Sequence, residues 1–537
     1  MATRPLPTRP NLDQLRQQAK ELKDAARAGE PAALERLSPY MPPGAQATLS
    51  VAQRAIAREY GFSSWPKLKA KVETRTMDLA DRVEAFLRAS VGGSEGRAAQ
   101  LLEMHPEIAG YDFRTAVVLG DAARVRALLA HDPGLAVRPT EPVGWPPLLG
   151  VCSSRWHRID PSRVEGMLEV ARMLLDAGAD PNTRVLPGQR GHCSTLYGAA
   201  GTANNPQITR LLLERGAVPD DETLYLSAFF SDHEGLRLLL PNSAALDKSF
   251  ALTAPISIGD IEGVRLLLEA GADPRRPFQA DLLGAARKAD PPIGPVAAAI
   301  ECDCSAELIE LLLRYGGDPN VQGKDGRSPL QLAMRQGRTD IAELLERHGA
   351  RDHATEVDHF LAACIHANGD QARRLLRENP DLLERLGDED RGGMIDAAEY
   401  GHTEAVLLML ELGFPVNTRA GEHGCTALHT AALSGCADLV RLLIDAGANL
   451  QARDSTWNST PLAWATVGSG LNRTDPNSRR NPHPDFPATV RTLIEAGAPI
   501  EDARPGPGKQ LSVEVTELLL DYGITRIASS DAAGGNV

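Results

Sequence analysis

The chain has 537 residues, of which 42% are apolar, 24% charged and 4% aromatic. This is too long for one ordinary hydrophobic core. The shortage of aromatic residues leaves Leu and Ala to supply most of the burial, as in an array of small, similar layers. The net charge of −14 argues against nucleic acid as a partner, because phosphate binding needs a basic face.

Two further patterns indicate a compartment. The opening stretch MATRPLPTRPNLDQL has no apolar core of a secretory signal, and no run approaches the roughly 18 apolar residues of a membrane span. The seven cysteines, an odd number without regular spacing, favour a reduced environment. We therefore expect a cytoplasmic protein that contacts no membrane.

Residues 1–75 differ from the rest of the chain in charge and in pattern. They hold 13 Lys or Arg and 7 Asp or Glu, a net charge of +6, which leaves −20 on the remainder. The stretch NLDQLRQQAKELKDAARAG predicts an amphipathic helix that ends at Gly29, and two more helices are predicted over 48–62 and 63–73. We expect a small helical N-terminal module, which either covers the first apolar face of the remaining chain or docks on an acidic surface.

Residues 424–454, GCTALHTAALSGCADLVRLLIDAGANLQARD, predict a pair of short helices. Thr426 can cap the first helix, and Gly435 ends it and lets the chain reverse. An apolar stripe over 439–443 marks the second helix, and Gly447 stands where a helix commonly ends in a left-handed residue. Such a pair cannot bury both faces alone, so it needs copies on either side.

Copies of this pair recur along most of the chain. Endings like that of the second helix lie at 173–182, 211–220, 266–275, 311–320, 343–352, 408–417, 442–451 and 492–501. Openings like that of the first helix are GRSPLQLAM, GCTALHTAA and NSTPLAWAT. The pattern resembles the ankyrin-repeat family, whose unit has about 33 residues, a T-P-L-H-type opening and a G-A-D-P-N-type ending. The resemblance implies an all-α fold, an α-solenoid of stacked helix-turn-helix units with short hairpin-like loops.

The resemblance extends to how the chain is divided. The module over 1–75 is similar to a helical region carried by many bacterial ankyrin-repeat proteins, which points to a bacterial member of the family. A polar stretch near 352–360 precedes a unit that ends with proline instead of Gly-Ala. We therefore predict one array over 76–352, a second over 353–527 and a disordered tail over 528–537. Insertions break the period at 152–167, 276–295 and 467–486.

No group of residues has the spacing of a catalyst, a cofactor site or a metal centre. The best metal set by residue type includes His429 and Cys436, seven residues apart. That is roughly 10 Å along a helix, whereas zinc needs every ligand within about 2.3 Å. Cys302 and Cys304 have no second pair, and GHCSTLYGAA lacks an oriented base and an oxyanion site. We predict no catalytic, cofactor-binding or metal-binding residues.

What remains is a surface for binding. The ankyrin resemblance implies that a protein partner is held on the concave face and the loop tips. Candidate contact residues at such tips are Arg419, Glu422, His423, Arg453, Asp454, Trp457 and, in the first insertion, Trp156. Trp457 stands out because an aromatic side chain at a polar tip is typical of a binding hot spot, although packing on the adjacent loop explains it equally well.

We therefore predict a non-enzymatic, monomeric scaffold that binds a protein partner and needs no cofactor. Two alternatives stay open. One is an enzyme whose unrecognised site lies in the N-terminal module or in the insertions. The other is a self-inhibited regulatory binder, whose basic module covers the acidic face of the array.

Overall fold

The computed structural model divides the chain into two compact units, Met1–Val218 and Pro219–Val537. The structure describes residues 6–7, 10–41, 47–62, 64–65, 68–69, 72, 78–139, 145–185, 193–277, 292–323, 326–421, 423–471, 481, 483–503 and 511–522. This division differs from the predicted boundaries at 75/76 and 352/353, and the tail predicted over 528–537 lies outside the described residues. None of the described helices combines the length and the apolar character needed to cross a membrane.

The N-terminal module contains the helices α1 (Leu12–Arg27), α2 (Pro31–Leu37), η1 (Ser38–Tyr40) and α3 (Leu49–Glu59). The apolar face of α1 packs against α3, and the buried residues of the module form a cluster of their own. The helices predicted over 11–29 and 48–62 are therefore present. The third predicted helix, over 63–73, includes positions outside the described residues.

The rest of the first unit consists of helices packed in pairs. In chain order the elements are α5 (Leu79–Val91), α6 (Glu95–Met104), η2 (Pro106–Ile108), α7 (Phe113–Leu119), α8 (Ala122–His131), η3 (Pro133–Ala136), α9 (Pro147–Ser153), α10 (Trp156–Ile159), η4 (Pro161–Arg163), α11 (Val164–Asp176), β1 (Arg184–Val185), β2 (Cys193–Ser194), the π-helix η5 (Tyr197–Thr202) and α12 (Pro206–Glu214). The two strands pair antiparallel, with Arg184 opposite Ser194. Each first helix packs on its own second helix, as α7 does on α8, and on the next first helix, as α7 does on α9.

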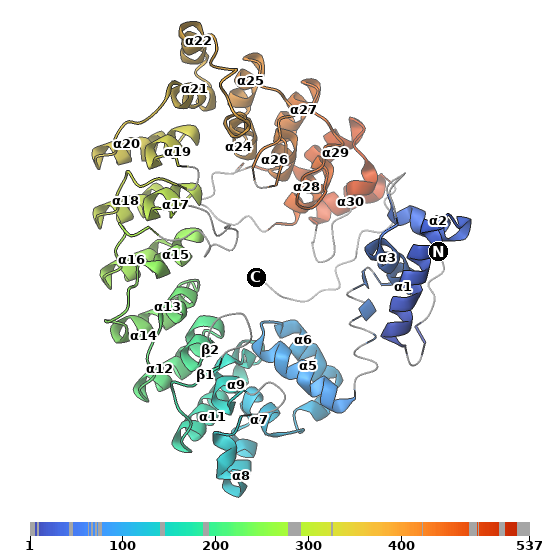
Figure 1. Ribbon diagram of the computed structural model, residues 1–537, viewed down its shortest axis with the longest axis vertical. Helices are drawn as coiled ribbons and strands as arrows, with labels where there is room; N and C mark the ends of the chain where they lie inside the picture. Colours follow the sequence, from blue (N-terminus) through green and yellow to red (C-terminus); the bar gives the residue numbers. More distant parts are fainter. Residues whose placement is uncertain are drawn as a thin grey trace. The chain divides into compact units, whose positions relative to one another are not determined.

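The second unit repeats the same arrangement. Its elements are α13 (Asp221–Ser227), α14 (Glu234–Leu239), η6 (Leu240–Asn242), η7 (Phe250–Leu252), α15 (Thr253–Ser257), α16 (Ile261–Glu269), α17 (Pro295–Glu301), α18 (Ala306–Arg314), α19 (Pro329–Arg335), α20 (Thr339–Arg347), α21 (Glu356–Ile365), α22 (Gly369–Glu378), α23 (Asp388–Arg391), α24 (Gly393–Glu399), α25 (Thr403–Glu411), α26 (Ala427–Leu433), α27 (Ala437–Asp445), α28 (Pro461–Ser469), α29 (Phe486–Glu495), η9 (Ile500–Ala503) and α30 (Val513–Asp521). The first helices α15, α17 and α19 form one row, and the second helices α16, α18 and α20 form another (Figure 1). The predicted all-α stack of helix pairs is confirmed.

Local sequence explains where each pair begins and turns. Thr426 is the N-cap of α26, and Gly435 follows that helix with φ +65°. Gly447 follows α27 with φ +87°, a left-handed backbone conformation that residues other than glycine rarely adopt. In α19, Ser328 is the N-cap and Pro329 takes the first helical position. Proline suits this position because it has no backbone N–H, and the helix offers no acceptor for an N–H there.

The stretch near 352–360 does not interrupt the packing. Arg335 at the end of α19 donates through Nε to the carboxylate of Asp358 in α21 at 2.5 Å, and its Nη1 donates to Asp390 at 2.6 Å. The Asp358 side chain is only 1% exposed. Within this part of the described chain, α19 and α21 are therefore neighbours in one stack, although the polar sequence predicted a break.

The three insertions have different outcomes. The insertion at 152–167 completes α9, forms α10 and η4, and enters α11. It is therefore built into the first unit as helical structure. Most of the insertion at 276–295 and the middle of that at 467–486 lie outside the described residues.

Candidate functional site

Two neighbouring loops of the second unit bring most of the predicted contact residues together. One loop connects α25 to α26 and the other connects α27 to α28. The Arg419 guanidinium donates to the carbonyl oxygens of Gly424 in its own loop and Arg453 in the next loop. The backbone N–H of Ser455 donates to the carbonyl of His423 at 2.7 Å. We call Arg419, His423, Arg453, Asp454 and Trp457 the loop-tip cluster.

Asp454 organises the second loop from the inside. Its carboxylate accepts from the backbone N–H groups of Thr456, Trp457 and Ser459 and from the indole N–H of Trp464, at 2.6 to 3.0 Å. Burial opposes ionisation of this carboxyl, but these donors outweigh it and lower its pKa. Asp454 is 3% exposed, so the expectation of an exposed contact residue is wrong. It positions the loop instead.

Trp457 is the exposed aromatic side chain of this loop. Its ring lies 4.4 Å, centroid to centroid, from that of His423 and 5.8 Å from that of Trp464. It nevertheless remains 54% exposed. The indole therefore packs on the adjacent loop and also faces solvent, while its part in binding stays a prediction. A packed aromatic ring loses little conformational freedom on binding, which is the property of a hot-spot side chain.

The cluster rests on a buried histidine in the first helix. His429 is 0% exposed. Its Nδ1 accepts from the backbone N–H of Thr426 at 3.2 Å, and its Nε2–H donates to the carbonyl of Ser459 at 3.2 Å. Burial lowers the pKa of this imidazole to about 4. The ring also packs edge-on against Trp464 at 5.4 Å, so contacts continue from this histidine through Trp464 to Trp457.

The remaining members of the cluster are cationic. Arg453 donates to the Asn458 carbonyl at 2.9 Å and pairs with Asp502 at 2.8 Å, while its side chain stays 42% exposed. Arg419 is also exposed. Glu422, which was predicted beside them, lies outside the described residues. The tip thus presents one exposed aromatic ring and two exposed guanidinium groups.

Trp156 does not belong to such a surface. It is 3% exposed, and its indole N–H donates to Oγ of Ser90 at 3.0 Å. Its ring packs on Phe86 at 5.8 Å, and the Arg163 guanidinium lies over it at 5.4 Å. Trp156, a predicted contact residue, is therefore buried, because it packs against Phe86 and Ser90 of α5.

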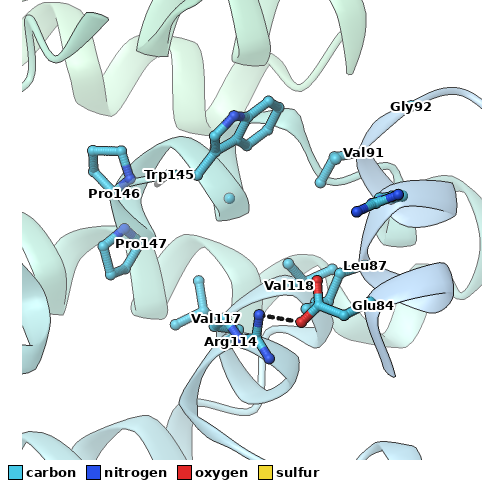
Figure 2. Close-up of a pocket in the computed structure, with 12 residues that line it drawn as sticks. Glu84, Leu87, Val91, Gly92, Arg114, Val117, Val118, Trp145, Pro146 and Pro147 are labelled. Atoms are coloured by element: carbon cyan, nitrogen blue, oxygen red, sulfur yellow. Dashed lines mark hydrogen bonds and ion pairs between the residues drawn. The ribbon is translucent and has the colours of Figure 1, made fainter. Parts of the chain in front are cut away.

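The first unit contains a pocket that the sequence did not indicate. It lies between α5, α7 and the start of α9 and has a volume of about 290 Å³. Figure 2 shows Trp145 and the prolines 146 and 147 on one side and Leu87 and Val91 on the other. Val117, Val118 and Gly150 complete its apolar lining. We call it the Trp145 pocket.

An ion pair borders the pocket at one end. Arg114 donates to Glu84 at 2.5 Å and pairs with Asp112 at 2.7 Å (Figure 2 shows the bond to Glu84). Burial disfavours the charged guanidinium, but the two carboxylates outweigh this effect and raise the pKa of Arg114. The charge of Glu84 is thus balanced by Arg114, and Arg114 is balanced by both Glu84 and Asp112.

One signal in the sequence could have found this pocket. Trp145 is followed directly by two prolines and an apolar helix, in a chain where aromatic residues are scarce. A rigid aromatic-proline segment before a first helix is suited to forming a wall. Its partners on α5 and α7, however, lie 27 to 61 residues earlier, and no local pattern places them opposite it.

Two of the cysteines weighed for metal or nucleophilic chemistry, Cys304 and Cys425, are buried. Within the described residues no three His, Cys, Asp or Glu side chains gather as metal ligands. Sγ of the buried Cys304 donates to the Ile256 carbonyl at 3.1 Å. Burial raises the pKa of Cys425 to about 11, so this thiol stays protonated at neutral pH.

Comparison with protein families identifies the repeats. Residues 359–454 match a family of ankyrin repeats described as three copies, and residues 325–356 match a single ankyrin repeat. The matches include α19 to α22 and α24 to α27, and hence the first loop of the cluster and part of the second. Together with the helix pairs of both units, they establish an α-solenoid of ankyrin repeats as the fold.

Several curated proteins are similar to parts of the chain. The E3 ubiquitin-protein ligase KEG of Arabidopsis thaliana is 24% identical over 384 residues, which cover 65% of this chain and 21% of that protein. Rabankyrin-5 of Mus musculus is 27% identical over 150 residues, 27% of this chain and 13% of its own length. A putative ankyrin repeat protein of fowlpox virus is 31% identical over 137 residues, 25% and 24% of the two chains. The chain thus spans less than a quarter of each of these relatives.

Proposed function

We propose that this chain is a non-enzymatic ankyrin-repeat scaffold, which captures a protein partner through the loop-tip cluster and the exposed face of its first helices. The repeats support a role in protein interaction. The seven cysteines, each free of a disulfide, support a reduced compartment. We accordingly place the scaffold in the cytoplasm of a bacterial cell, as a monomer that acts without a cofactor.

One observation carries the location of the proposed contact. Trp457 remains 54% exposed although Asp454 and His423 hold its loop and its ring in one arrangement. Exposing an indole in water is unfavourable by about 25 cal/mol for each Å² of apolar surface. A partner that covers this ring gains that free energy without having to order the loop first.

The test is affinity capture by the tagged full-length chain from a lysate of the source organism, read by mass spectrometry. We expect the double variant Trp457→Ala, Arg453→Ala to capture at least about ten-fold less of the partner, as for loss of a hot spot. Circular dichroism and thermal unfolding of the variant should match those of the wild-type protein.

A matched control separates the cluster from exposed aromatic surface in general. Tyr315 is 44% exposed at the end of α18, and Tyr315→Ala should leave capture unchanged. If a folded double variant captures as much partner as the wild-type protein, the loop-tip cluster is not the contact surface.

A second comparison addresses the N-terminal module. A chain without residues 1–75 should capture the same partner, because the module has its own buried cluster and the proposed contacts lie elsewhere. A partner captured only by the full chain would move recognition to the module. Stronger capture by the shortened chain would favour the self-inhibited alternative.

A further inference from the structure

The Trp145 pocket is apolar but only partly covered by the protein itself. Val117 and Val118 are buried at its base, whereas Leu87, Val91 and Trp145 are half-buried. Its volume of about 290 Å³ is close to the lower end of the range for ligand pockets in proteins, about 300 to 1,000 Å³. That space accommodates a large apolar side chain.

One cation of the lining has no partner among the described residues. Arg88 lines the pocket from α5, one residue beyond Leu87, and its side chain is exposed. Nothing in the described part of the chain forms a hydrogen bond or ion pair with its guanidinium. The other two charged groups of the lining, Glu84 and Arg114, are paired with each other. Of the charged groups that the structure describes in the lining, Arg88 is therefore the one that an incoming group can pair with, and its charge is positive.

We propose that the Trp145 pocket binds a segment of a partner protein that carries a large apolar side chain next to a carboxylate. The apolar side chain fills the space between Trp145 and Leu87, and the carboxylate pairs with Arg88. This inference rests on the proposed scaffold function and adds the chemistry of one recognised segment. An arginine suits this role because its guanidinium can hold a carboxylate through two parallel hydrogen bonds.

The same charge argues against the N-terminal module as the occupant. Residues 1–75 carry a net charge of +6, and a basic segment would bring like charge to Arg88. A neutral apolar segment would fill the space between the apolar walls but give the Arg88 guanidinium no carboxylate to pair with. An acidic, apolar segment satisfies both parts of the pocket, which is why we commit to it.

Gly150 allows the pocket to be filled without disturbing the fold. It lies in α9 and lines the pocket, and a Cβ there would meet only the methyl groups of Val118 at 3.7 Å and Val117 at 3.9 Å. These are ordinary contact distances. Leucine also favours a helix more than glycine does. Gly150→Leu should therefore place its side chain in the space that the partner's side chain needs.

The probes are three fluorescein-labelled peptides of sequence Gly-Ser-Asp-X-Asp-Ser-Gly or its lysine counterpart, titrated with the full-length protein by fluorescence anisotropy. The first has Trp at X between the Asp residues, the second has Ala at X, and the third has Trp between Lys residues. We expect the first to bind at least about ten-fold more tightly than the others, as expected for loss of one buried anchor or one ion pair at a binding site.

Variants assign the binding to the pocket. The Gly150→Leu substitution should weaken binding of the Trp-Asp peptide at least ten-fold, as expected when a binding site loses its anchor. Gly96→Leu, at an exposed helix position with nothing within 4 Å, should not weaken it. Arg88→Gln should remove the preference for Asp over Lys, whereas Arg97→Gln, an exposed arginine of α6, should preserve it.

Other results overturn the proposal. It fails if the Trp-Asp peptide does not bind at about 1 mM protein, or if the Lys or Ala peptide binds as tightly as the Trp-Asp peptide. It also fails if the Gly150→Leu variant binds the Trp-Asp peptide as tightly as the wild-type protein does. None of these results bears on capture through Trp457, which lies in the other unit. Loss of capture by the Trp457 variant together with absent peptide binding would leave the scaffold function standing and remove only this inference.

Discussion

Trp464 in α28 donates its indole N–H to the carboxylate of Asp454 at 3.0 Å, ten residues earlier in the chain. The same carboxylate accepts three backbone N–H groups of the loop between them. Because a carboxylate with several donors orders the backbone around it, this contact joins a repeat helix to the loop that presents Trp457. The exposed part of the loop thus depends on a buried acid.

We predict that Asp454→Ala loosens this loop. The substitution leaves four N–H donors without their acceptor, and hydrogen bonds to a charged group contribute about 1.5 to 3 kcal/mol. We expect a loss of about 3 kcal/mol in the local free energy of opening, measured by hydrogen–deuterium exchange of residues 454–460. Asp445→Ala, which removes an exposed carboxylate at the end of α27, is the control and should leave exchange of the loop unchanged.

The stability of the second unit should depend on pH through His429. Its folded-state pKa of about 4 lies below the ordinary value of 6.5, so the unfolded chain binds the proton first as pH falls. The contribution of neutral His429 to the free energy of unfolding is fully present above about pH 6.5. It is lost progressively as the pH falls to about 4, and it amounts to about 3 kcal/mol. Urea unfolding followed by tryptophan fluorescence between pH 7 and 4 measures it.

The chain itself supplies the control for this titration. Gln331 occupies the corresponding position of α19, and its side chain accepts the backbone N–H of Ser328 at 2.9 Å. His429→Gln should therefore keep the cap of α26 without a titrating ring. Stability of this variant should fall less steeply with acid. Equal slopes for both proteins would show that His429 does not carry the effect.

Local signals predicted the helix pairs, while contacts distant in sequence decided which predicted residues reach the surface. Gly435 and Gly447 mark turns because their own backbone conformation requires glycine. Trp156, by contrast, is buried by Phe86 and Ser90, about 70 residues earlier, and a local pattern carries no information about such partners. The residues of the loop-tip cluster were predictable from their place at the tips, but the burial of Asp454 follows from how the loop folds.

Asp358 tests whether the stack is continuous where the sequence predicted a boundary. Its side chain is buried and accepts from Arg335 and from Gln331 of α19. Removing one partner of a buried ion pair costs about 3 to 5 kcal/mol. Asp358→Ala should therefore speed amide exchange in both α19 and α21. Glu343→Ala, an exposed site on α20, should not. Faster exchange in α21 alone would show that the two helices open independently.

Replacing either of two helical glycines by alanine should change the thermal stability, but in opposite directions. Gly166 lies within α11, and a Cβ there would meet the carbonyl oxygen of Gly120 at 2.2 Å, whereas a Cβ at Gly96 in α6 meets nothing within 4 Å. Alanine is favoured over glycine in a helix by about 1 kcal/mol, so Gly96→Ala should raise the thermal midpoint. Gly166→Ala should lower it, because the clash is with backbone and α11 must move away from α7; such overpacking costs about 1 to 3 kcal/mol. Differential scanning calorimetry compares the two, and a higher midpoint for Gly166→Ala would show that α11 is not held against Gly120.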